Sequence, residues 1–357
     1  MSVTKKISVI TVLLLLSLTI IFKVYGNKSK ESIEGKVYVK ILDSMVVNGF
    51  DKDTHFKRIG SKLFGSGNFS LVEYTYEGKP IHTYIGTYLG CVDGKKKRDK
   101  KIPLRLDSWA YDPIKDEVIL WGLDEYFYFY KNGNFIRKEQ HKFFKENLNN
   151  SVWRNFLAFN QQIVVPFIQA KHYLDFETTT QTPLLAKLAF PNIFISYMGT
   201  WDSLFKGRNM AKSGEHVLLC SDTEGRVIFS NAHNSYRIHK ITEDNKEIIF
   251  GSPYKSISGL TIKNESSEGG KYWNNSIYYE PKNDLLLRTT LSPKNNNGTR
   301  QTILQIYKGE VLKNEIILPS SMNALVYVSP DLELWFEDYN KNELQTKIYK
   351  TKLIAEP

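Results

Sequence analysis

Short runs of apolar and aromatic residues alternate with tight polar turns along nearly the whole chain. Gly78 and Gly133 each stand in a short polar turn between two such runs, which is typical of a β-hairpin. The pattern predicts a first strand at residues 37–42 and hairpins over residues 69–85, 126–137, 216–230, 303–318 and 332–349. Because these hairpins are spread over the chain rather than clustered, they favour one repeated architecture over two unlike domains.

Three of the predicted turns share a motif, at residues 111–116, 279–284 and 329–331. In each, a proline fixes φ early in the turn, an acidic or amide side chain caps it, and a strand-forming run follows. Such a repeating unit is typical of a β-propeller or another repeat array. About 320 strand-rich residues at roughly 40 to 55 per blade predict six to eight blades, and the wide spacing of the motif favours six or seven, of which we take six.

Helix is scarce in the pattern. Residues 142–148 form one amphipathic stretch, and a second helix is predicted between residues 169 and 176. Both fall between strand groups, where a propeller accommodates insertions. The prediction is therefore an all-β chain, a single β-propeller domain over residues 37–354, with few short helical insertions.

The first residues have the pattern of an export segment. Lys5 and Lys6 precede the apolar run 7–22, and polar residues begin at Asn27. Two interpretations stay open: a signal peptide over residues 1–26, cleaved after Gly26, or an uncleaved membrane anchor through residues 7–22. Either predicts an exported protein, periplasmic or on the cell surface, joined to its propeller by a linker at residues 27–36. The apolar run has no cysteine at its end, so lipoprotein attachment is not expected.

Several strand segments, together with the export segment, resemble a known group of proteins. They are residues 214–230, 235–238 and 277–288. They are similar to the uncharacterised six-bladed β-propeller proteins of bacterial cell envelopes. That family has no established activity, so the resemblance implies a fold and an envelope location but no catalytic residues. Its members are often lipoproteins, and this chain departs from them by lacking the cysteine.

Charge and cysteines change this picture little. The formal net charge is +10, and much of the excess lies in residues 95–101, which we interpret as a solvated loop. No nucleic-acid partner is expected, because the run lacks interleaved aromatics and the chain is exported. Cys91 and Cys220 could pair outside the cytoplasm, but the apolar context of Cys220 favours a buried free thiol.

No motif for catalysis, metal or cofactor is found in the sequence. His233 and His239 are better explained as turn and strand residues than as metal ligands, and no Gly-x-Ser-x-Gly elbow is present. Asp112 and Asp116 fit turn capping better than acid–base chemistry. We therefore predict no catalytic residue, no metal ligand and no cofactor.

Aromatic residues are the predicted binding class. The candidates are Trp121, Tyr126, Tyr128, Tyr130, Tyr272 and Trp273. On a strand, Tyr126, Tyr128 and Tyr130 point one way and Phe127 and Phe129 the other. The tyrosine face either opens to a rim that stacks sugars or a partner's side chains, or is buried between blades.

The function predicted from the sequence is non-enzymatic recognition of a protein or glycan in the cell envelope. The alternative is a propeller hydrolase or lyase with its site in the central channel. Ionisable groups that converge at one mouth of the channel would favour the alternative.

Overall fold

The structure is a computed structural model that describes residues 37–48, 54–67, 70–85, 103, 106–122, 124–147, 156–166, 183–200, 217–232, 235–251, 272–293, 300–338 and 345–355. Residues Tyr38–Ile354 form one compact unit, which holds the sheets, and the other unit comprises Met1–Val37 and Ala355–Pro357. The export segment lies outside the described residues. Among the helices of the described ranges, none has the length and apolar character needed to cross a membrane.

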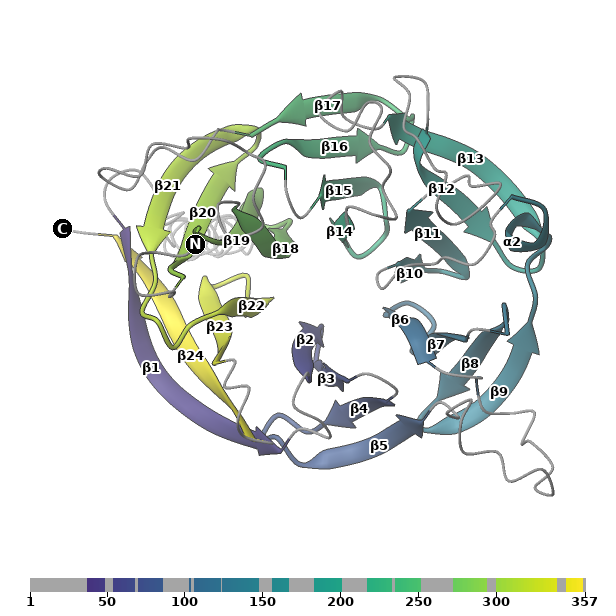
Figure 1. The fold of residues 1–357 in the computed structure, drawn as a ribbon, viewed down its shortest axis with the longest axis horizontal. Coiled ribbons are helices and arrows are strands. Elements are labelled where there is room, and N and C mark those ends of the chain that lie inside the picture. Colours follow the sequence, from purple (N-terminus) through teal and green to yellow (C-terminus); the bar gives the residue numbers. More distant parts are fainter. Residues whose placement is uncertain are drawn as a thin grey trace, which may run out of the picture. The chain divides into compact units, whose positions relative to one another are not determined.

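Six four-stranded sheets form a ring, so the predicted all-β, six-bladed propeller is confirmed (Figure 1). Blade 1 consists of β2 (His55–Ile59), β3 (Lys62–Ser66), β4 (Ser70–Tyr74) and β5 (Pro80–Ile85). Blade 2 consists of β6 (Leu106–Asp112), β7 (Glu117–Gly122), β8 (Phe127–Lys131) and β9 (Asn134–Glu139). Blade 3 consists of β10 (Leu157–Phe159), β11 (Gln162–Pro166), β12 (Pro183–Ala189) and β13 (Ile193–Thr200).

The second half of the ring is built in the same way. Blade 4 consists of β14 (Val217–Ser221), β15 (Val227–Ala232), β16 (Ile238–Thr242) and β17 (Glu247–Phe250). Blade 5 consists of β18 (Trp273–Glu280), β19 (Leu285–Leu291), β20 (Thr302–Lys308) and β21 (Val311–Ile317). Blade 6 consists of β22 (Ala324–Val328), β23 (Glu333–Asp338), β24 (Gln345–Ala355) and β1 (Val37–Asn48). All five predicted hairpins are confirmed as paired neighbouring strands.

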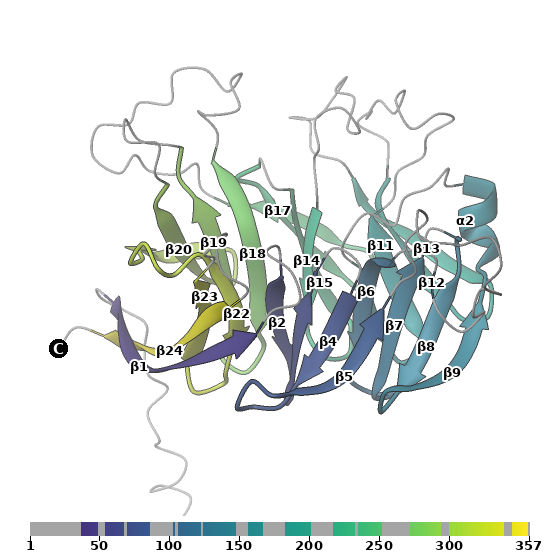
Figure 2. The same cartoon turned by 60° about the horizontal axis from the view of Figure 1, so that its bottom comes forward.

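The ring closes within blade 6. Its sheet has the order β1-β24-β23-β22, so the first strand of the chain is the outermost strand of the last blade. The predicted helix near residue 142 is α2 (Lys142–Asn147), which follows β9, whereas the helix predicted at 169–176 falls outside the described residues. Figure 2 shows α2 just beyond the end of β9, at the other end of that strand from the β8–β9 turn.

The proline motif marks the turn between the first and second strands of a blade. Asp112 Oδ1 accepts hydrogen bonds from the backbone amides two and three residues later, at 3.0 and 3.2 Å. Glu280 repeats this arrangement in blade 5 at 2.9 and 2.8 Å. In blade 6, Ser329 Oγ accepts from the amides of Asp331 and Glu333 at 3.3 and 2.9 Å. The predicted acidic cap is therefore confirmed in blades 2 and 5, whereas in blade 6 the hydroxyl of Ser329 caps the turn instead.

A second hydrogen bond completes the two longer copies of the motif. Tyr111 OH donates to Asp116 Oδ1 at 2.7 Å, and Tyr279 OH donates to Asp284 Oδ1 at 3.1 Å. Both aspartates have positive φ, 55° and 52°, a conformation that aspartate tolerates better than most residues. The motif thus folds in the same way in blades 2 and 5.

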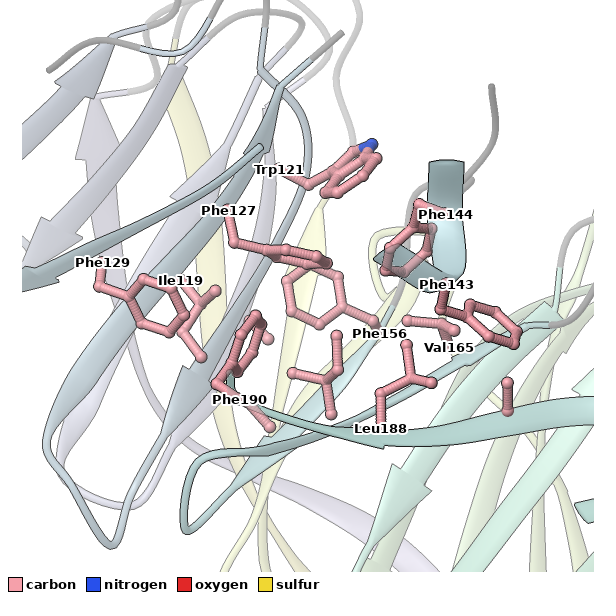
Figure 3. Packing of buried hydrophobic residues seen from close by; sticks show 14 residues of the cluster. Ile119, Trp121, Phe127, Phe129, Phe143, Phe144, Phe156, Val165, Leu188 and Phe190 are labelled. Atoms are coloured by element: carbon pink, nitrogen blue, oxygen red, sulfur yellow. The ribbon is translucent and has the colours of Figure 1, made fainter. Parts of the chain in front are cut away.

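The blades pack through both of their faces. Figure 3 shows one of these contacts, between blades 2 and 3. Phe127 and Phe129 of β8 contact Phe190 of blade 3, with ring centroids 5.0 and 4.8 Å apart. The opposite face of β8 carries Tyr128 and Tyr130, which belong to a cluster shared with blade 1. Because both faces are covered, the inner strands are continuously apolar instead of alternating.

The contact between blades 6 and 1 has a distinct chemistry. The Arg58 guanidinium of β2 lies 4.0 Å from the ring centroid of Tyr327 and 4.5 Å from that of Trp335, both in blade 6. Within blade 1 it also lies 5.1 Å from the ring centroid of Tyr76. The buried carboxylate of Glu337 also accepts a hydrogen bond from the Phe56 amide at 2.8 Å. We call this set of contacts between blades 6 and 1 the closure seam.

Blades 3 and 4 are joined by a carboxylate. Glu247 Oε1 accepts from His239 Nδ1 at 2.7 Å and from the Thr200 amide at 3.2 Å, and Oε2 accepts from Thr200 Oγ1 at 3.0 Å. Burial raises the pKa of Glu247, but the hydrogen bonds from His239 and Thr200 outweigh it and hold the pKa below the ordinary 4.5.

We predict an acid-sensitive contact at Glu247. Because its folded pKa is depressed, its contribution to stability is present above the unfolded pKa and is lost as pH falls through the folded pKa. Glu247→Gln should therefore lower the free energy of unfolding at neutral pH and flatten its fall below about pH 4.5. Urea unfolding across pH checks this, and an unchanged pH profile would contradict it.

Candidate functional site

Four of the six predicted binding aromatics are buried in the structure, namely Trp121, Tyr128, Tyr130 and Tyr272. Tyr128 OH donates to Asp124 Oδ2 at 2.5 Å and lies 2.7 Å from Lys138 Nζ, within the protein. Tyr126 and Trp273 are partly exposed. The Lys138 ammonium lies 3.8 Å from the Tyr126 ring centroid. One face of the Tyr126 ring is therefore already covered by a cation of the protein.

The outer strand of blade 3 offers a more exposed surface. Ile193, Phe194, Ile195 and Tyr197 of β13 are 55%, 44%, 40% and 37% exposed. We call these four residues the edge patch. Successive residues of a strand point to opposite faces, so the exposure of residues 193–195 leaves both faces of the strand open to solvent.

Aromatic contacts hold the edge patch in place. The Phe194 ring stacks on Phe143 of α2, with centroids 5.6 Å apart and planes at 7°. The ring centroids of Tyr197 and Phe194 are 4.7 Å apart. Phe143 is itself buried in the core between blades 2 and 3. The patch is therefore supported by the interior and is not a loose surface segment.

The geometry of β13 suits contact with another chain. It is the outermost strand of its sheet and pairs with β12 on its inner side. An outer strand presents backbone donors and acceptors at its edge, and such edges pair readily with an added strand. In β13 the Tyr197 carbonyl already accepts from Asn245 Nδ2 at 3.0 Å and the Thr200 amide donates to Glu247, so an added strand would pair with the residues before Tyr197. Contiguous exposed apolar side chains mark interaction surfaces. The edge patch is thus our candidate binding site.

The remaining predicted features do not add to this site. Cys220 is a free, buried thiol, in line with the unpaired interpretation, whereas Cys91 lies outside the described residues. The basic run 95–101 and His233 also lie outside them, and His239 bonds to Glu247. Within the described ranges, no group of three or more His, Cys, Asp or Glu side chains is arranged to hold a metal ion.

The edge patch could not be predicted from the local sequence pattern. The run Ile193–Ile195 follows a Pro-Asn turn, and three consecutive apolar residues are typical of a buried strand. Its exposure depends on β13 being the fourth strand of its blade, which is a property of the sheet order. No local pattern in the sequence encodes that position.

Comparison with known proteins identifies the fold. A crystal structure of a member of the DUF4221 family from Bacteroides vulgatus is similar to this chain, with a TM-score of 0.57 and 9% sequence identity. The alignment covers 90% of this chain and all of that one. At this identity the similarity extends to the propeller fold and not to a function. No protein-family description matches the chain, and no curated protein matches it either.

We predict that the edge patch contributes little to folding. Ile195→Lys should change the free energy of unfolding by no more than about 0.5 kcal/mol, because the side chain is exposed. Leu188→Ala, in the buried neighbouring strand β12, should lower it by about 2–5 kcal/mol. Urea unfolding of both variants checks this, and a large loss for Ile195→Lys would show that the patch is structural.

Proposed function

We propose that this protein is a non-enzymatic β-propeller of the cell envelope that binds a partner protein through the edge patch. The lysines and the apolar run 7–22 support export or anchoring. The observation that carries the binding proposal is the exposure of Ile193, Phe194, Ile195 and Tyr197 on an outermost strand.

The chemistry of the patch favours a partner with an extended apolar segment. A strand added beside the part of β13 that precedes Tyr197 would gain main-chain hydrogen bonds, and alternate side chains would contact the exposed rings and aliphatic groups. A glycan partner has less support. Its stacking surface would rest on Tyr126 and Trp273, which are only partly exposed.

A propeller hydrolase or lyase is the second candidate, and one observation favours it. The His55 side chain, at the start of the innermost strand β2, is 60% exposed and its Nδ1 lies 3.0 Å from Glu337 Oε1. The Glu337 side chain is only 2% exposed. A histidine held by a buried carboxylate is an arrangement used in general acid–base catalysis. Loss of a measured hydrolytic activity in His55→Gln would support this candidate.

Site-specific photo-crosslinking in the host cell tests the binding proposal. A photoreactive residue at Ile195 should form a discrete crosslinked adduct with one partner protein. The matched control is Ile136, which is 49% exposed on β9, the outermost strand of blade 2. The proposal predicts an adduct at 195 that Ile193→Lys abolishes and no such adduct at 136. Equal patterns at both positions would contradict it.

A further inference from the structure

A second feature lies where the innermost strands of the blades meet around the axis of the ring (Figure 1). Blades 1 and 5 are not neighbours in a ring of six, yet the Lys57 ammonium of β2 in blade 1 reaches the Tyr278 ring of β18 in blade 5. The Lys57 side chain therefore extends from its own blade toward the axis. Beside burial, which is the larger effect on both groups, Lys57 and Cys220 of β14 in blade 4 each shift the pKa of the other, in line with this placement.

Blade 5 supplies the third member. The Lys57 ammonium lies 6.0 Å from the ring centroid of Tyr278 on β18. The Tyr278 hydroxyl donates a hydrogen bond to the Val326 carbonyl of blade 6, which fixes the ring. Lys57, Cys220 and Tyr278 form what we call the axial cluster, and both Lys57 and Tyr278 are partly exposed to solvent.

The axial cluster holds one positive charge without a negative partner among the described residues. Burial raises the pKa of Cys220 and of Tyr278, so both stay neutral. Burial lowers the pKa of Lys57, because the ammonium loses hydration and gains no carboxylate. Two other lysines of the blades are paired with carboxylates: Lys62 lies 2.7 Å from Asp116, and Lys138 lies 3.1 Å from Asp124.

We propose that the axial cluster binds a carboxylate, which pairs with the Lys57 ammonium beside the Tyr278 ring. A single ammonium matches the single charge of a carboxylate, whereas a phosphate dianion needs more donors. An acidic protein side chain and a uronic acid of a glycan share this chemistry. The axial cluster shares no residue with the edge patch. A failure to bind carboxylates at the axial cluster would therefore not contradict the proposed binding of a protein at the edge patch.

Acylation of lysines in the full-length native protein, quantified by peptide mass spectrometry, tests the site. Only the neutral amine is acylated, so a bound carboxylate that holds Lys57 as ammonium should slow its acylation about tenfold or more. The probes are D-glucuronate for a glycan and N-acetylaspartate for a protein side chain. Their matched neutral controls are glucose and N-acetylasparagine. Lys282, whose side chain is 64% exposed, is the reference lysine.

Protection of Lys57 by either carboxylate, but not by its neutral control, supports the proposal, and the probe that protects identifies the source. Absence of protection, equal protection by the neutral controls, or no acylation of Lys57 in the native protein would overturn it. Two variants add a second readout. The rise in melting temperature caused by the protecting probe should persist in Lys57→Arg and disappear in Lys57→Met. Its persistence in Lys57→Met would also overturn the proposal.

Discussion

The pairing of β1 with β24 is the constraint on which the ring depends, because it places strands from both ends of the chain in one sheet. The closure seam then joins that blade to blade 1. There the Arg58 guanidinium packs among Tyr76, Tyr327 and Trp335, and Glu337 caps the Phe56 amide. Cation–π contacts of this kind are each worth about 0.5–2 kcal/mol, so the two that cross the seam, to Tyr327 and Trp335, reinforce the closing contact.

Closure also decides which surfaces are available for function. In a closed ring each blade has a neighbour on both faces, so the aromatic rings of β8 are used in packing. Besides the turns, the parts of the described blades that remain open to solvent include the outermost strands and some side chains near the axis. The edge patch on β13 belongs to the first class, and the axial cluster belongs to the second. Both candidate sites follow from the architecture.

The sequence predicted the repeating elements well, because turn chemistry is local. The Asp112 and Glu280 turns, the glycine hairpins and the helix at residue 142 were all visible in short segments. The sites were not predicted, because they depend on which strands become neighbours or outer edges. Lys57, Cys220 and Tyr278 are far apart in sequence and share no motif. The tyrosines of β8 are buried by blade 1, which a strand pattern alone does not reveal.

Deletion of β1 tests most directly whether the ends of the chain close the ring. A chain that lacks residues 1–36 keeps β1, whereas one that lacks residues 1–48 loses it. Closure by β1 predicts that only the second deletion lowers the free energy of unfolding and speeds hydrogen–deuterium exchange in β24. Equal stability and equal protection of β24 in the two truncated chains would show that the ring does not depend on this strand.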